Sequence, residues 1–163
     1  MSYQEKRTIV SIASGVVLMI AYCIYALVRL GWNSLGDVRS WATTMLVFIG
    51  IGIVAMIVIQ IVFHILLSIG IAVKKKIADE PIDDQAIESS IEREMVEDEM
   101  DQLIELKANK IGYSFVSVGF VAGLIALALG ALPAVMLNIV FLACMLGTIV
   151  EGLIQIRYYR KGV

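Results

Sequence analysis

Chemically reactive side chains are scarce in this sequence of 163 residues. It contains one histidine, two cysteines and two prolines. Cys23 and Cys144 lie in separate apolar stretches, and their spacing matches no metal-binding or redox motif. A nucleophile paired with a base and a glycine-rich phosphate loop are missing as well. We therefore expect no enzymatic activity, no metal site and no cofactor.

Charge is also sparse outside one segment, and apolar residues make up 60% of the chain. A soluble domain is about 45–50% apolar, so the excess indicates residues that contact lipid. The net charge of −2 is too small to suggest a nucleic-acid surface. The composition therefore points to a membrane protein and away from nucleic-acid binding.

Four apolar stretches are long enough to cross a bilayer core of about 30 Å as helices. They cover residues 8–28, 42–73, 111–131 and 134–156. The first exceeds the roughly 7–15 apolar residues of a cleaved signal peptide, so we expect it to remain as a span. Between the last two, Gly130 and Pro133 predict a tight turn followed by a helix start. These patterns predict an all-α fold, an integral membrane four-helix bundle in which residues 1–163 form a single domain.

Basic residues flank the four stretches unevenly. One side of the membrane would hold Lys6, Arg7, Lys74, Lys75, Lys76, Lys107, Lys110, Arg157, Arg160 and Lys161. The opposite side would hold Arg29 and Arg39. Lys and Arg near span ends mark the cytoplasmic side, so both termini and the segment 74–110 are expected in the cytoplasm. Trp32 and Trp41 then fall near the outer face, where amphipathic rings settle.

Polar residues inside the apolar stretches form a candidate intramembrane site. Its members are Gln60, His64, Ser68, Ser117 and Glu151. Gln60, His64 and Ser68 are spaced i, i+4 and i+8, so they share one face of a helix. Ser68, Ser117 and Glu151 lie roughly 10 Å inside the nearest basic flank, His64 lies about 15 Å inside it, and Gln60 is nearer the midplane. Because polar groups are costly in lipid, we expect them to turn inward, with His64 and Glu151 in a shared interior.

This layer allows three interpretations. A histidine titrates near neutral pH and burial disfavours a charged carboxylate, so His64 and Glu151 would form a protonatable or ligand-binding pair. Alternatively, the polar groups only fix helix packing, through hydrogen bonds that are usually worth under about 2 kcal/mol each. As a third interpretation, Glu151 reaches the membrane interface, because it lies less than two turns from Arg157.

Small residues recur at helical spacing in the third and fourth stretches. Those expected at helix contacts are Gly119, Gly123, Gly130 and Gly147. Glycine lets neighbouring helix backbones approach closely in membranes. We therefore expect these two spans to pack tightly.

The segment 74–110 carries twelve acidic and six basic residues, a net charge of −6. Asp84 is a suitable N-cap for a helix. Beyond it, acidic residues form one helix face: Glu94, Glu97, Asp98, Asp101 and Glu105. The pattern predicts an amphipathic cytoplasmic helix over 84–107, between the second and third spans. Its acidic face is either simply solvated or a docking surface for a basic cytoplasmic protein.

The run EDEMDQLIELKANKIGY, from Glu97 to Tyr113, resembles a juxtamembrane motif of uncharacterised small multi-pass membrane proteins of Gram-positive bacteria. The ending from Glu151 to Gly162 is similar to the last span of those proteins. The resemblance covers mainly the second half of the chain. It implies a bacterial plasma membrane and genes encoded beside small helix-turn-helix regulators, but no activity.

Two hypotheses about function follow. In the first, the chain is an interaction or regulatory module whose acidic helix engages a cytoplasmic partner. In the second, it is a small oligomeric transporter or channel component that uses the polar layer around His64 and Glu151. The expected partners are the lipid bilayer, a basic cytoplasmic protein and a second copy of the chain. Interrupted spans and internal repeats, which many transporters show, are missing, and this favours the first hypothesis.

Overall fold

The computed structural model describes residues 3–30, 36–77 and 99–161, and these are helical except for short connections. Helix α1 (Tyr3–Tyr25) continues into a short π-helical segment, η1 (Ala26–Leu30). The others are α2 (Val38–Ile77), α4 (Glu99–Ala128) and α5 (Pro133–Lys161). In each of them an apolar sequence without an internal proline lets the backbone pair with itself, as lipid requires.

All four helices are long and apolar enough to cross a membrane. The qualifying stretches are Gln4–Val28, Val38–Leu66, Glu99–Ala128 and Pro133–Lys161. A crossing needs about 20 mainly apolar residues, and each stretch meets that length. By length and composition, the prediction of an all-α, multi-pass membrane protein with four spanning helices is confirmed.

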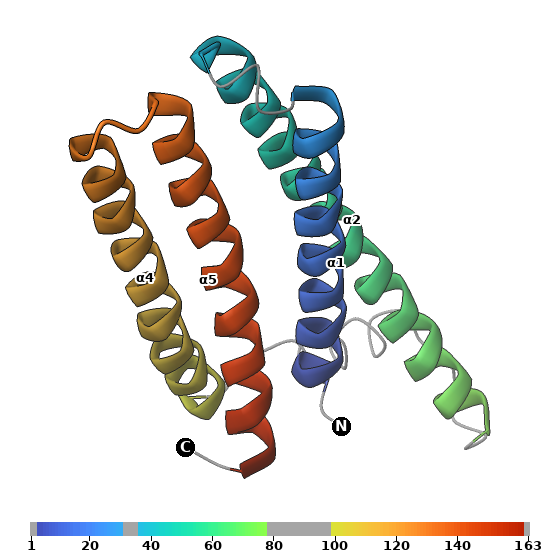
Figure 1. The fold of residues 1–163 in the computed structure, drawn as a ribbon. Coiled ribbons are helices and arrows are strands. Elements are labelled where there is room, and N and C mark those ends of the chain that lie inside the picture. The colour runs from blue at the N-terminus through green and yellow to red at the C-terminus, as the bar shows by residue number, and fades with distance from the viewer. Residues whose placement is uncertain (1–2, 31–35, 78–98, 162–163) are drawn as a thin grey trace.

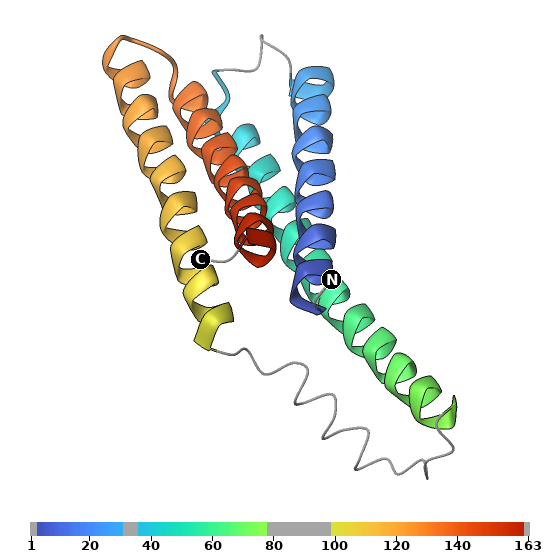
Figure 2. The same ribbon diagram turned by 90° about the horizontal axis from the view of Figure 1, so that it is seen from below.

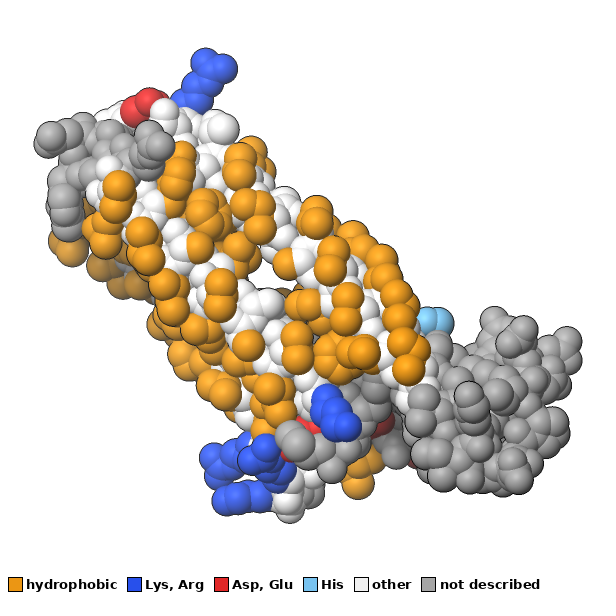
Figure 3. All heavy atoms as spheres, turned by 90° about the vertical axis from the view of Figure 1, so that its right-hand side faces the viewer, with side chains coloured by type: hydrophobic (Ala, Val, Ile, Leu, Met, Phe, Trp, Pro, Cys, Tyr) orange, Lys and Arg blue, Asp and Glu red, His pale blue; other side chains and the backbone are white. Residues whose placement is uncertain are grey.

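The four helices alternate in direction, so both chain termini lie at one end of the molecule, called the terminal end below (Figure 1). The opposite end, called the turn end, holds the connection between α4 and α5. Helices α4 and α5 form an antiparallel pair, and α1 contacts both α5 and α2 (Figures 1 and 2). Towards the terminal end, α2 diverges from the other three helices (Figure 2). In Figure 3, hydrophobic side chains cover the surface between two ends that carry Lys and Arg.

Helix α2 begins at an aspartate cap. The Oδ1 atom of Asp37 accepts a hydrogen bond from the Ser40 amide at 3.2 Å, and Oδ2 accepts one from the Ser40 hydroxyl at 2.5 Å. These bonds, above all the one from the hydroxyl, keep the pKa of the exposed Asp37 carboxyl below its usual value. The cap satisfies an amide that the first turn of a helix would otherwise leave unpaired.

A glycine turn joins α4 to α5. Gly130 has a φ of 91°, a conformation that glycine adopts without strain, and its amide donates to the Leu127 carbonyl at 3.0 Å. A Cβ atom at Gly130 would meet nothing within 4 Å. Gly130 therefore serves the turn that the sequence predicted there, and it does not make the helix contact that was also expected of it. Pro133 then begins α5, as expected for a proline in the first turn.

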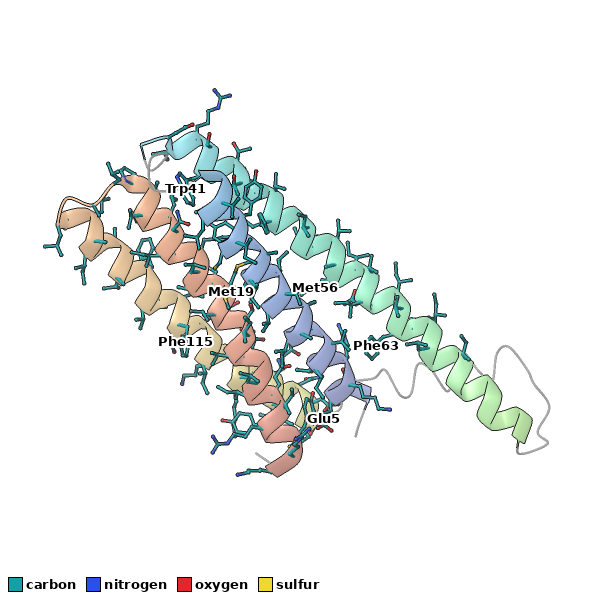
Figure 4. All side chains as sticks on the ribbon, turned by 45° about the vertical axis from the view of Figure 1, so that its right-hand side comes forward. Glu5, Met19, Trp41, Met56, Phe63 and Phe115 are labelled. Atoms are coloured by element: carbon teal, nitrogen blue, oxygen red, sulfur yellow. The ribbon has the colours of Figure 1, made fainter. Side chains whose placement is uncertain are left out.

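A hydrophobic cluster at the turn end joins α1, α2 and α5. Its buried members are Tyr22, Ala26, Trp41, Met45, Phe48 and Ala134. The ring of Tyr22 packs edge-on against Phe48, at 5.3 Å between centroids, and against Phe141, at 4.6 Å. Edge-to-face pairs add to the stability that burial supplies. Figure 4 shows Trp41 of α2 at this end, turned towards the neighbouring helices.

Small residues set the distance between α4 and α5, which share the most extensive contact in the described chain. A Cβ atom at Gly119 would collide with the Cβ of Ala143, and one at Gly147 would lie 2.9 Å from the Gly112 carbonyl oxygen. At Gly123 the nearest atom, Cγ of Met136, would be 3.2 Å away. Side chains larger than hydrogen would therefore force the two backbones apart.

Candidate functional site

Polar side chains link α1 to α5 at the terminal end. This terminal polar cluster consists of Glu5, Thr8, Glu151, Gln155 and Arg160. Glu5 and Thr8 lie one turn apart on α1, and Glu151 and Gln155 lie one turn apart on α5, so each pair shares a helix face. Figure 4 shows Glu5 beside the last turns of α5.

An ion pair fastens the start of α1 to the end of α5. The Nε atom of Arg160 donates to Oε1 of Glu5 at 2.8 Å. Glu5 is only 6% exposed, whereas the Arg160 side chain is 60% exposed. A buried carboxylate is costly unless it is paired, and this charge-assisted bond offsets that cost. Loss of Arg160 would therefore leave a buried carboxylate without this cation.

The carboxamide of Gln155 lies between Thr8 and Glu151. Its Nε2 atom donates to Oε1 of Glu151 at 3.4 Å, and its Oε1 atom lies 3.4 Å from the Thr8 hydroxyl oxygen. The single proton of that hydroxyl has a shorter bond, 2.9 Å, to the Gln4 carbonyl of its own helix. The bridge through Gln155 is thus long by hydrogen-bond standards and weaker than the ion pair.

Glu151 lies where α1, α4 and α5 meet. A Cβ atom at Gly112 of α4 would be 3.1 Å from Cβ of Glu151 and 3.2 Å from its Oε2 atom. On the side of α1, a Cβ at Gly152 would lie 3.7 Å from Thr8. The bare backbone of Gly112 therefore makes room for a half-buried carboxyl group between α4 and α5.

The terminal polar cluster brings two carboxyl groups to one end of the bundle, and Arg160 pairs with one of them. Within the part of the chain that the structure describes, no three His, Cys, Asp or Glu side chains are grouped so that they could hold a metal ion. The arrangement joins α1 to α5 through the ion pair and one long hydrogen bond, and a second long bond, from Gln155 to Glu151, lies within α5. It supports the interpretation of these residues as packing contacts.

The structure does not bring His64 next to Glu151. Gln60 and His64 are exposed. Phe63, their neighbour on α2, lies where this helix diverges from the other helices (Figure 4). The side chain of Ser68 lies outside the described part. The inward layer around His64 and Glu151 assumed a closed bundle, whereas α2 leaves it before this depth. The hypothesis of a transporter depended on that layer.

Ser117, another predicted member of that layer, is exposed on α4. Its hydroxyl donates to the Tyr113 carbonyl of the same helix at 3.0 Å. Such a bond satisfies a hydroxyl without any neighbouring helix. Ser117 therefore does not join Glu151 in a common site.

The predicted acidic face is described only in part. Asp101, which is partly exposed, and Glu105, which is exposed, lie in the first turns of α4. Glu94, Glu97 and Asp98 lie outside the described residues. In the described portion, the acidic first turns and the apolar membrane-crossing part belong to one helix that begins at Glu99.

A second polar contact, at the turn end, was not anticipated from the sequence. The hydroxyl of Tyr22, which is 1% exposed, donates to Oδ1 of Asn138 at 2.6 Å. The Nδ2 atom of Asn138 donates in turn to the Ala134 carbonyl at 2.8 Å. The available signal was Asn138 itself, a carboxamide deep in an apolar stretch, which calls for a partner.

Glu5 and Gly112 were also missed. Glu5 is one of three acidic residues outside the segment 74–110, the others being Asp37 and Glu151. An isolated acid beside an apolar stretch was therefore a usable signal for Glu5. For Gly112 there was no such signal, because its value depends on which residue of α5 faces it.

Comparisons of the chain with protein-family models, with curated proteins and with solved structures find no match. The resemblance of the juxtamembrane run to a bacterial family thus gains no support from them. What stands is the architecture, a small multi-pass membrane protein with four spanning helices.

Proposed function

We propose that this chain is a membrane-embedded interaction module that engages a basic cytoplasmic protein through the acidic helix over 84–107. Twelve of its fifteen acidic residues lie between Lys74 and Lys110. In the described part of that segment, Glu99 and Glu105 are exposed, whereas Ile104 is buried. Carboxylates are therefore available to a partner while an apolar side chain holds the helix in place. Complementary charge steers such encounters and selects the partner.

The continuity of α4 carries this proposal. The helix runs without a break from Glu99 through Ala128, so the charged first turns and the membrane-crossing part form one rod. Close contacts at Gly119 and Gly147 then join this rod to α5. A protein bound to the acidic turns would thus act on the whole α4 and α5 pair.

The proposal places both termini and the segment 74–110 in the cytoplasm, with the chain in the plasma membrane. The excess of Lys and Arg at the terminal end supports this orientation. Single cysteines introduced in a chain without Cys23 and Cys144 test it. A membrane-impermeant thiol reagent added to intact cells should label Gly36→Cys and leave Ser2→Cys unlabelled. The reverse pattern would invert the topology.

The partner is tested with the full-length tagged protein in native membranes, followed by cross-linking and mass spectrometry. The triple variant Asp98→Asn, Asp101→Asn, Glu105→Gln removes charge from the acidic face. We expect capture of the basic partner to fall by roughly tenfold, given modest contributions from each exposed charge pair. Added salt should weaken wild-type capture as well, because exposed charges are screened.

The matched control is Asp79→Asn, Glu80→Gln, Asp83→Asn, which removes the same charge outside the 84–107 helix. We expect this control to retain the partner. Equal capture by both variants and the wild-type chain would contradict docking through the acidic face. Equal loss in both variants would show that net charge, rather than this helix face, attracts the partner.

A further inference from the structure

Helix α2 carries a face on which a carboxamide follows four apolar side chains. The members of this Gln60 face are Leu46, Ile49, Ile53, Met56 and Gln60, at alternating spacings of three and four residues. The four apolar members are 45–68% exposed, and Gln60 is exposed too. This spacing is the one by which two helices pack along a shared seam.

Gln60 differs from the other carboxamides of the apolar stretches. Asn138 bonds to Tyr22 of α1, and Gln155 bonds to Glu151. Within the described ranges, the carboxamide of Gln60 has no hydrogen-bond partner. Its neighbours on the helix surface are mainly apolar, such as Ile57, which is 50% exposed, and His64 follows one turn further along.

Gln60 lies inside the candidate span Val38–Leu66, away from the charged flanks of α2. Roughly 20 Å of helix separate it from Lys74, and roughly 28 Å separate it from Trp41, at about 1.5 Å per residue. A glutamine side chain is far shorter than either distance. Lipid tails offer neither donors nor acceptors, so an amide at this depth needs a partner from protein.

Closing α2 onto its own bundle would not supply that partner. The α2 residues packed towards α1 include Met45, Phe48 and Gly52, and a Cβ at Gly52 would lie 3.2 Å from Leu18. At about 100° per residue, continuing this stripe brings Ile59 and Phe63 inward. Gln60 would remain about 60° from Phe63 and roughly 90° from the middle of this stripe, outside the face that packs towards α1.

We propose that a second copy of this chain covers the Gln60 face, in a parallel pair in which the two Gln60 carboxamides hydrogen-bond to each other. Two copies inserted in the same direction are related by a two-fold axis along the membrane normal, which sets both Gln60 residues at one depth. A carboxamide holds both a donor and an acceptor, so it is complementary to its own copy. The apolar members of the face then pack above the amide pair, which fixes the register.

Disulfide trapping in native membranes tests the pair. In a chain with Cys23→Ala and Cys144→Ala, single cysteines are placed at Ile53 and Met56 on the face. The control is Val54→Cys, since Val54 is 60% exposed, as Met56 is, but lies about 100° around the helix from Ile53. We expect same-site dimers to form several-fold faster at positions 53 and 56 than at 54. Equal rates, or cross-links only to a different protein, would overturn the proposal.

The role of Gln60 itself is tested by Gln60→Leu, because a leucine side chain needs no hydrogen-bond partner in lipid. Energy transfer between labelled copies, diluted with added lipid, reports the dissociation constant. We expect Gln60→Leu to weaken self-association roughly 3- to 20-fold, the range for one interhelical hydrogen bond in a membrane. The matched control Met56→Leu should change it much less. Unchanged or tighter association of Gln60→Leu, or a wild-type chain that stays monomeric, would contradict the amide pair.

Discussion

Helices α4 and α5 stay in contact along most of their length, whereas α2 follows α1 only near the turn end and then departs. On α4, a Cβ atom at Gly112, Gly119 or Gly123 would lie no more than 3.2 Å from an atom of α5. On α2, Gly52 meets Leu18, but Gly50 has nothing within 4 Å. The number of glycines therefore does not decide whether two helices pack closely. What decides is whether the glycines fall at the spacing of the partner's ridges.

The largest difference in stability is expected between substitutions of two methionines of α2. Met45 is 7% exposed in the turn-end cluster, and Met56 is 60% exposed. We expect Met45→Ala to lower the free energy of unfolding by about 2–4 kcal/mol, because it leaves a cavity. Met56→Ala should change it by less than about 0.5 kcal/mol in dilute detergent. Unfolding by titration with a denaturing detergent measures both, and equal losses would mean that α2 is packed along its whole length.

The next largest effect concerns single methyl groups on glycines. We expect Gly119→Ala to lower the free energy of unfolding by about 1–3 kcal/mol, since its Cβ collides with that of Ala143. Gly50→Ala meets open space and should be neutral or slightly stabilising, because alanine favours helix. Both values come from the same unfolding titration. A neutral Gly119→Ala would show that α4 and α5 adjust freely.

The swap Gly119→Ala with Ala143→Gly sharpens this result. It moves one methyl group across the interface and keeps the combined volume. We expect the double variant to recover most of the stability that Gly119→Ala loses, so the two changes should be strongly non-additive. Additive losses would place the damage in the helix itself and not in its contact with α5.

A smaller effect is expected where α1 meets α5 at the turn end. Tyr22→Phe keeps the ring packing against Phe48 and Phe141 but removes the bond to Asn138. We expect a loss of about 0.5–1.5 kcal/mol in the free energy of unfolding. Tyr25→Phe is the control, because Tyr25 is exposed on the same helix. If both variants lose the same stability, the hydroxyl of Tyr22 contributes nothing specific.

The smallest effect is a local pH dependence at the start of α2. The bonds from Ser40 lower the pKa of Asp37 in the folded protein, so the charged cap stabilises α2 above the usual aspartate pKa and is lost as the pH falls through the lowered value. The NMR shift of the Ser40 amide should follow that titration while the melting temperature barely changes. Asp37→Asn keeps a capping oxygen, so it should abolish the titration and retain the first turn. A Ser40 amide shift that stays constant with pH would contradict the cap.

The fold was largely predictable from the sequence, for simple physical reasons. Uninterrupted apolar stretches have no stable alternative to helices in lipid, so their lengths predicted α1, α2, α4 and α5. Pro133 has no amide proton to lose at a helix start, and Gly130 accepts a positive φ, so the turn between α4 and α5 was also readable. These signals are local and need no knowledge of neighbours.

The candidate site was less predictable because it depends on which helix faces meet. A span that is apolar on every side does not reveal which side contacts lipid. Polar character suggested that His64 faces inward with Glu151, yet α2 diverges and exposes it. The actual neighbours of Glu151, Gly112 of α4 and Gln155 of α5, follow from helix rotations that one sequence does not encode visibly.

The position of α5 in the chain has a consequence for how the protein is made. Tyr22 and Asn138 are 116 residues apart, and Glu5 and Arg160 are 155 apart. At about 5–20 residues per second, α1 waits on the order of ten seconds for the helix that satisfies its buried polar groups. Until then, the packing available to α1 is with α2 and includes the contacts of Tyr22 and Tyr25 with Phe48. The rate of translation thus sets the time at which the bundle can assemble, because α1 needs contacts with α5, the last helix to be synthesised.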